Sequence, residues 1–280
     1  MGNTLIRLIK ICFLILFAGC TSEVNEMKYP GTKKEDVQDY IFGKTIEDPY
    51  RWLEDFTSEE ATEWVERQNN LTDIYLENEY QKKIKHDLED IWITEDISIP
   101  FRRGDKTFYY YDDGKQQQSV FMMKDCNSCE PEVLLDPNKF STDGTVSLSD
   151  ISVSPNGEYL AYSVSDGGSD WRTWKVLNIQ KKQETDDVIE WSKFSYATWE
   201  SDSSGFYYQR YKQPDEVLSD INKSPQLFFH RLGDKQEKDK LIYEDKKNPD
   251  YSWSISVPEK GRYRVLSIGE GTDERNFLSI

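Results

Sequence analysis

The stretch that decides the fold reads NGEYLAY at residues 156–162, a polar turn with a glycine that leads into an apolar strand. Three further stretches repeat this pattern: RGDKTFYY at 103–110, SGFYY at 204–208 and KGRYRVL at 260–266. A glycine in such a turn suits the positive φ of a tight hairpin. The four stretches therefore predict a series of hairpins, one in each structural repeat.

The glycines of these turns, Gly104, Gly157, Gly205 and Gly261, follow one another at intervals of 53, 48 and 56 residues. A period near 50 residues that holds several short strands is typical of a β-propeller blade. A β-sandwich of similar hairpins stays open as an alternative, although its strands need not recur at a fixed long interval. From about residue 97 to Ile280 there is room for three to four blades, so we expect a mainly β, incomplete propeller whose repeat array is cut short.

The residues before this array read as helices. Thr57 or Ser58 can cap a first helix, and Thr57 with Glu60 would form a capping box. Apolar residues then follow at helical spacing on one face, and a second face of this kind precedes Pro100. The first face is made by Ala61, Trp64, Val65, Gln68, Leu71 and Tyr75, the second by Tyr80, Ile84, Leu88 and Ile91. Two helices alone bury too little to be stable, so these faces need a partner.

Composition limits the class of protein. Aromatic residues make up 14% of the 280 residues, which indicates a folded chain rather than a disordered one. The formal net charge is −17. Nucleic-acid binding needs clustered Lys and Arg, so we expect no nucleic-acid partner. The high net negative charge needs no further explanation than that it keeps the protein soluble.

The first twenty residues read as a targeting segment. Arg7 and Lys10 precede an apolar run from Ile11 to Ala18, which is too short to span a membrane. The run ends in LFAGC at residues 16–20, which resembles the lipobox of bacterial lipoproteins except that Phe17 stands where Leu is usual. This resemblance implies cleavage before Cys20, a lipid on its sulfur and a tether at residues 21–28. An uncleaved anchor or an ordinary secretory signal is the alternative.

Two further cysteines lie in the sequence CNSC, at Cys126 and Cys129. A zinc site would need more ligands, and the two histidines, His86 and His230, are remote in sequence. We therefore expect no metal and no cofactor, and either a local disulfide or two free thiols in a hairpin loop. For both histidines we expect a structural or solvent-facing role.

Several short stretches share a likeness to one known family, and the most specific is DPYRWLED at residues 48–55. The others are YP at 29–30, QN at 68–69, LDPN at 135–138, DGT at 143–145, SPNGEY at 154–159, GSDW at 168–171, KFS at 193–195 and GRY at 261–263. Taken together and in order, these stretches resemble the prolyl oligopeptidase family of serine peptidases, and the likeness covers nearly everything from Tyr29 to Ile280.

The resemblance implies a domain plan. In the family, N-terminal helices of an α/β-hydrolase domain precede a seven-bladed propeller, and the hydrolase core with its Ser-Asp-His triad follows it. Residues 29–95 would then be the helical segment of the peptidase domain, and residues 96–280 the first three to four blades. The hydrolase core that would cover the helices is absent from this chain. The sequence contains no Gly-x-Ser-x-Gly, so we expect no catalytic residue in it.

The resemblance also points to residues that contact substrate. Phe194 matches a family position whose ring lines the apolar part of the substrate pocket, where an aromatic offers a large contact area. Asp170 and Trp171 match a loop that faces the same cavity, and Thr272 lies near another cavity position. For each residue the alternative is an ordinary place in a blade core or turn.

The function implied is that of the N-terminal portion of a serine endopeptidase that cleaves short peptides after proline, with the propeller restricting substrate size. The implied partners are an oligopeptide substrate and the missing hydrolase domain, and the implied location is a bacterial cell envelope, facing the periplasm through the Cys20 lipid. A non-enzymatic propeller lipoprotein that binds a peptide or glycan is the rival hypothesis.

Overall fold

The computed structural model describes residues 28–214, 222–258 and 261–280. The chain divides into two compact units, residues 1–89 and 90–280. The signal segment and Cys20 lie outside the described residues.

The first unit contains one hairpin, a short 3₁₀ helix and an α-helix. The hairpin pairs β1 (Gln38–Ile41) with β2 (Lys44–Glu47), and it is followed by η1 (Arg51–Glu54) and α2 (Glu59–Leu76). Arg51 ties these parts together, because its guanidinium contacts Asp39 of the hairpin and lies 2.8 Å from an Asp48 carboxylate oxygen. The charged residues of the DPYRWLED stretch therefore fix the chain's entry into the helical segment.

Both expected helices are present, and the second, α3 (Glu79–Trp92), spans the boundary between the units. Ser58 is the cap of α2, because its hydroxyl accepts a hydrogen bond from the Ala61 amide at 3.3 Å. The Thr57/Glu60 capping box is wrong: the Thr57 hydroxyl donates to Asp55 instead. The apolar residues of the α3 face are exposed in the described structure.

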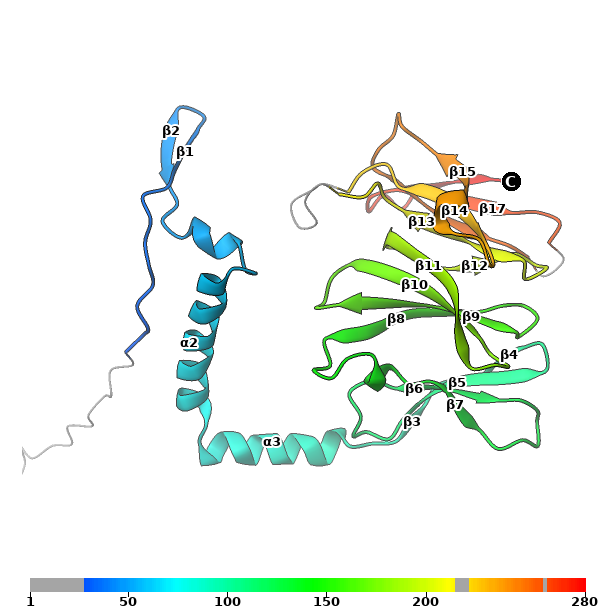
Figure 1. The fold of residues 1–280 in the computed structure, drawn as a ribbon, viewed down its shortest axis with the longest axis horizontal. Helices are drawn as coiled ribbons and strands as arrows, with labels where there is room; N and C mark the ends of the chain where they lie inside the picture. The colour runs from blue at the N-terminus through cyan, green and yellow to red at the C-terminus, as the bar shows by residue number, and fades with distance from the viewer. Residues whose placement is uncertain (1–27, 215–221, 259–260) are drawn as a thin grey trace, which may run out of the picture. The chain divides into compact units, whose positions relative to one another are not determined.

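The second unit is built of antiparallel blades, which Figure 1 shows as successive layers. A single residue pair, Ser192 with Arg210, joins the edges of the second and third blades into one continuous sheet. In the first blade an interrupted inner strand, β3 (Asp96–Ile97) with β4 (Phe101–Arg103), precedes β5 (Lys106–Asp112), β6 (Val120–Lys124) and β7 (Glu132–Leu135). The second blade holds β8 (Val146–Val153), β9 (Tyr159–Asp166), β10 (Trp171–Asn178) and β11 (Gln183–Lys193).

The third blade holds β12 (Thr198–Trp199), β13 (Gly205–Arg210), β14 (Gln226–Arg231) and β15 (Lys240–Glu244). A last sheet contains β16 (Tyr251–Ser256), β17 (Val265–Glu270) and β18 (Asn276–Ser279). Strands within each blade pair antiparallel. The expectation of three to four propeller blades is confirmed, and a two-sheet sandwich is excluded for this unit.

Three apolar clusters fill the spaces between consecutive blades. Strand β9 shows how: Leu160 and Tyr162 belong to the cluster shared with the first blade, whereas Ala161 belongs to the cluster shared with the third. In β13 Phe206 and Tyr208 face the second blade, and Tyr207 faces the fourth. This follows from the period of two in strand side chains, which sends neighbours to opposite faces.

The glycine turns of the sequence repeat join the first two strands of each blade, as expected. Gly104, Gly157 and Gly261 have positive φ. Gly104 and Gly157 also touch one another's turns, because a Cβ on Gly104 would lie 2.5 Å from the Asn156 carbonyl oxygen and one on Gly157 would lie 2.6 Å from that of Arg103. The repeat glycine therefore allows turns of neighbouring blades to stack closely.

Gly205 differs from this expectation. Its φ is not positive, and Ser203 takes the left-handed conformation of that turn, with φ 61°. Gly205 is needed for a different reason, since a Cβ there would lie 2.1 Å from the His230 carbonyl oxygen of the neighbouring strand. Cys126 and Cys129 form a local disulfide in the β6–β7 loop, which is one of the two expected forms.

A buried charged network connects the second blade to the third. His230 is fully buried, with its Nε2 atom 2.9 Å from Asp187 and its Nδ1 atom 2.8 Å from Asp239. Asp187 also accepts a hydrogen bond from the Gly233 amide, and the Tyr208 hydroxyl donates to Asp239 at 2.6 Å. The expected structural role of His230 is therefore confirmed.

This network predicts a pH dependence of stability. Burial alone would lower the pKa of His230, but the hydrogen bonds to Asp187 and Asp239 outweigh burial and raise it to about 9. The unfolded value is about 6.5, so the stabilisation is complete below pH 6.5 and is lost as pH rises through about 9. The pKa of Asp187 is lowered despite its burial, mainly by the His230 hydrogen bond. The stability that the Asp187 carboxylate contributes is therefore lost only in acid.

We expect the free energy of unfolding to fall between pH 6.5 and 9, and the variant His230→Gln to lose that slope. This substitution should lower the free energy of unfolding by about 3–5 kcal/mol near neutral pH, because it leaves the buried carboxylates without a cation. Chemical denaturation at several pH values measures both effects. His86→Gln, which changes the other histidine of the chain, is the matched control, and an equal slope in wild type and His230→Gln would contradict the assignment.

Candidate functional site

The candidate residues all lie at one edge of the blades. Because neighbouring strands are antiparallel, the hairpins between second and third strands share an edge opposite the glycine turns. Asp170 and Trp171 occupy this hairpin in the second blade, and Thr272 occupies it in the fourth. Phe194 follows the end of β11 at the same edge. We call this edge the site face.

Three of the four predicted residues are brought together around Lys193. Trp171 pairs directly with Lys193 across β10 and β11. The Lys193 ammonium lies 5.3 Å from the Trp171 ring centroid, 5.2 Å from that of Phe194 and 3.4 Å from an Asp170 carboxylate oxygen. Cations attract aromatic faces at such distances. Thr272 is exposed, and it lies outside the contacts that gather the other three around Lys193.

Phe194 is presented to solvent rather than packed in a blade. Its side chain is 59% exposed, so the blade-core alternative is excluded. It has φ 53°, and Trp191 three residues earlier has φ 59°. Bulky residues rarely adopt the left-handed region, which persists where the surroundings hold it and which is concentrated at functional sites.

Hydrogen bonds to β13 hold the segment that carries Phe194. The Ser192 hydroxyl donates to the Gln209 carbonyl at 2.8 Å, and the Gln209 amide donates to the Ser195 hydroxyl at 2.7 Å. The Tyr211 amide donates to the Trp191 carbonyl at 3.0 Å. The backbone on either side of Phe194 is therefore fixed against the third blade.

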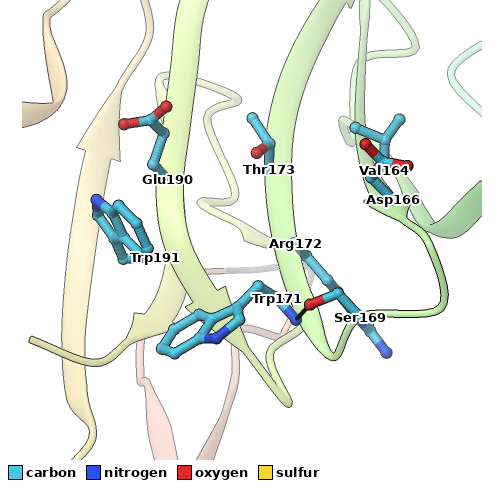
Figure 2. A pocket seen from close by; sticks show the side chains of 8 residues that line it. All are labelled: Val164, Asp166, Ser169, Trp171, Arg172, Thr173, Glu190 and Trp191. Carbon is cyan, nitrogen blue, oxygen red and sulfur yellow. Dashed lines mark hydrogen bonds between the residues drawn. The ribbon is translucent and has the colours of Figure 1, made fainter. Parts of the chain in front are cut away.

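A shallow cavity of about 230 Å³ lies beside this cluster, and Figure 2 shows its lining side chains. Trp171 and Trp191 meet edge to face, with ring centroids 5.7 Å apart. The Ser169 hydroxyl accepts a hydrogen bond from the Trp171 amide at 3.1 Å, which shapes the hairpin. Tyr211 packs on Trp171 from the third blade, and burial raises the pKa of its phenol.

Sequence reasoning missed the parts of this site that connect the predicted residues. Lys193, Trp191 and Tyr211 gave no motif of their own, although Lys193 stands in the same KFS stretch as Phe194. The one sequence feature that could have pointed to them was the high number of aromatic residues near the ends of β11 and β13. Among the described residues no group of three or more potential ligands could hold a metal ion. Within the same residues, no helix has the length and apolar character that a membrane span requires.

The aromatic surface at this edge of the propeller suits contact with a peptide, because its rings offer apolar area and charged groups of both signs, Lys193 with Asp170 among them, surround them. Residues 29–279 match the family model described as "Prolyl oligopeptidase, N-terminal beta-propeller domain". The chain therefore belongs to the prolyl oligopeptidase family and contains its N-terminal propeller portion.

Similar proteins of known activity support this family assignment. The chain is 42% identical to a prolyl endopeptidase of Elizabethkingia miricola over 252 residues, which cover 89% of this chain and 36% of that protein. Identity to the prolyl endopeptidase of Elizabethkingia meningoseptica is 40%, with the same coverage. The chain thus spans a little over a third of the length of these curated relatives.

Solved structures show the same fold. A structure from a study of two prolyl endopeptidases superposes with a TM-score of 0.77 at 29% identity and covers 90% of this chain and 37% of its own. Prolyl oligopeptidase B from Galerina marginata, bound to a 35mer hydrolysis and macrocyclization substrate, gives a TM-score of 0.73 at 27% identity, covering 90% of this chain and 38% of its own.

Proposed function

We propose that this chain is the substrate-selecting portion of a serine endopeptidase that cleaves short peptides after proline. The observation that carries the proposal is the aromatic cluster of Phe194 and Trp171 around Lys193, presented on one face of a propeller whose relatives are named prolyl endopeptidases. The Gly-x-Ser-x-Gly of a hydrolase nucleophile does not occur in these 280 residues, so the chemistry requires a partner hydrolase domain.

The proposal assigns a mechanism to the whole protein. A serine of the hydrolase domain attacks the peptide carbonyl, a histidine takes and returns the proton, and an aspartate orients that histidine. This chain contributes binding: the Phe194 ring contacts an apolar part of the peptide, and the propeller restricts the size of the peptide that enters. The exposed apolar face of α3 supports the same view, since a hydrolase core would cover it.

We expect the variant Phe194→Ala, in a protein that includes the hydrolase domain, to raise KM for a proline-containing peptide about three- to tenfold with kcat nearly unchanged. KM rises alone when the lost contact stabilises the bound substrate and the transition state equally, which we expect of an apolar contact with the Phe194 ring. Steady-state kinetics with a chromogenic proline peptide measures this, and the 280-residue chain alone should give no hydrolysis above a buffer blank.

Phe42→Ala is the matched control for that measurement. Phe42 is fully exposed and, like Phe194, has a positive φ, 51°, but it lies in the β1–β2 hairpin outside the blades. Its substitution should leave KM unchanged. Equal KM values for Phe194→Ala and wild type would refute the substrate contact, and hydrolysis by the 280-residue chain that a serine-reactive inhibitor blocks would refute the division of labour.

We further propose that the protein is held in a bacterial cell envelope, facing the periplasm, by a lipid on Cys20. The support is the LFAGC stretch at residues 16–20. Wild type should separate with membranes and carry a mass added at Cys20 after loss of the first nineteen residues, whereas Cys20→Ser should keep those residues and lose the added mass. Mass spectrometry of both proteins from a bacterial host measures this. An unmodified Cys20 in the wild-type protein would rule the anchor out.

A further inference from the structure

A cavity of about 390 Å³ lies at the edge of the blades opposite the site face, between the first and second blades. Four connections line it, two from each blade. They are the glycine turns at residues 104–105 and 154–158 and the loops after the third strands, at residues 125–131 and 179–182. We call it the turn-edge cavity, and it shares no residue with the cluster around Lys193.

The turn-edge cavity has an apolar floor and a charged rim. Met123 and Ile179 line it with side chains that are only 3% and 0% exposed. The other lining side chains are in contact with solvent, and they include charges of both signs: Asp105, Lys106, Asp125, Glu132, Glu158 and Lys182. A ligand in solution therefore reaches the rim without movement of a blade.

Two lysines of the rim have hydrogen-bonding capacity left. The Lys106 ammonium lies 2.6 Å from an Asp125 carboxylate oxygen, and the Lys182 ammonium lies 2.6 Å from a Glu132 oxygen of the neighbouring blade. An ammonium group carries three N–H donors, and these ion pairs use one donor of each lysine. Each lysine can therefore donate to a carboxylate of a ligand while it keeps its own partner.

Two carboxylates of the rim stand at equivalent places in the repeat. Asp105 and Glu158 each follow the glycine of their turn, and the turns touch, because the Gly104 amide donates to the Pro155 carbonyl at 3.2 Å. Glu158 accepts the side-chain amide of Asn156 at 2.9 Å, but within the described residues neither carboxylate forms an ion pair. Both can therefore accept from a cationic group of a ligand.

The local disulfide belongs to the same cavity. Cys126 directly follows Asp125, and Cys129 precedes Glu132 by three residues, so the crosslink joins the two ends of the loop that carry these carboxylates. A crosslink over so short a loop removes little freedom from the unfolded chain. Its effect is local: it restricts the rim and reduces the ordering that a ligand would have to impose.

The combination of groups selects the class of ligand. A simple anion would leave Asp105 and Glu158 without a cation, and a simple amine would leave the free lysine donors unused. A zwitterion satisfies both, through charge-assisted hydrogen bonds at each end. The volume is near the lower end of the range for small-ligand pockets, which suits one amino acid rather than a peptide.

We propose that the turn-edge cavity binds a free α-amino acid with an apolar side chain. The ammonium group of the amino acid contacts Asp105 and Glu158, and its carboxylate accepts hydrogen bonds from Lys106 and Lys182. Its side chain covers Met123 on the floor. This site is separate from the site face, so the inference goes beyond the proposed function and does not depend on it.

Isothermal titration of the protein that includes its hydrolase domain tests the ligand class. L-leucine, L-valine and L-methionine are the probes, and at least one should bind. Three analogues of leucine each lack one feature: 4-methylpentanoate lacks the ammonium group, 3-methylbutylamine lacks the carboxylate, and glycine lacks the side chain. Each analogue should bind at least about tenfold more weakly than leucine, because one set of contacts is lost.

Two outcomes of this titration would overturn the site. One is the absence of binding by all three amino acids at concentrations up to about 10 mM, above the millimolar range of weak ligands. The other is binding of the amine or of the carboxylate as tight as that of the amino acid, which would leave an ordinary charged surface.

The variant Asp105→Asn locates the site. It should weaken amino-acid binding about tenfold, because it removes a charged acceptor, and it should leave the hydrolysis of a proline peptide unchanged. Asp234→Asn, at the same edge but in the third blade, is the matched control and should bind as wild type does. Binding that survives in Asp105→Asn but is lost in Phe194→Ala would place the amino acid at the site face and contradict the proposal.

Discussion

The alternation of side chains along each blade strand is the constraint on which the rest of this structure depends. A strand between two others in a stack of sheets has no solvent-facing side, so both faces must carry apolar residues. Strand β9 shows this with Leu160 and Tyr162 on one face and Ala161 on the other. The small Ala161 shares its cluster with the large Trp174 and Trp199 side chains, whereas Leu160 and Tyr162 belong to the cluster on the reverse face. Each blade is thereby fixed by the blade before it and the blade after it.

This constraint also explains where binding chemistry can occur. The faces of the strands are committed to the inter-blade clusters, so only strand ends and the hairpins between them can vary freely. The glycine turns occupy one edge and stack closely on their neighbours, as Gly104 and Gly157 do. The opposite edge is open, and it presents Phe194, Trp171 and Lys193. The charged residues buried inside the described part of the stack are paired, as His230 is with Asp187 and Asp239, and Glu200 with Arg264.

Much of the fold could be predicted from the sequence because the glycine turn repeats at a nearly constant interval. The same repeat misled at Gly205, where the residue avoids a clash with the His230 carbonyl instead of adopting a positive φ. That difference comes from the approach of a neighbouring strand, which no local pattern records. The helix cap shows the same limit, since Thr57 and Ser58 are equally able to cap and the backbone geometry selects Ser58.

The candidate site was less predictable, for a physical reason. Phe194, Asp170 and Trp171 could be named from short stretches, but Lys193 joins them only because β10 and β11 pair in one register. Thr272 shares the site face but is not among the residues that contact Lys193 there.

The central claim is that substrate peptides meet this propeller at the site face. Photo-crosslinking tests it most directly: a short peptide carrying benzoylphenylalanine is irradiated with the protein, and the attached residues are mapped by mass spectrometry. The account predicts attachment within residues 166–171 and 191–196. Attachment concentrated instead at the glycine turns, around residues 103–105 and 155–158, would contradict it.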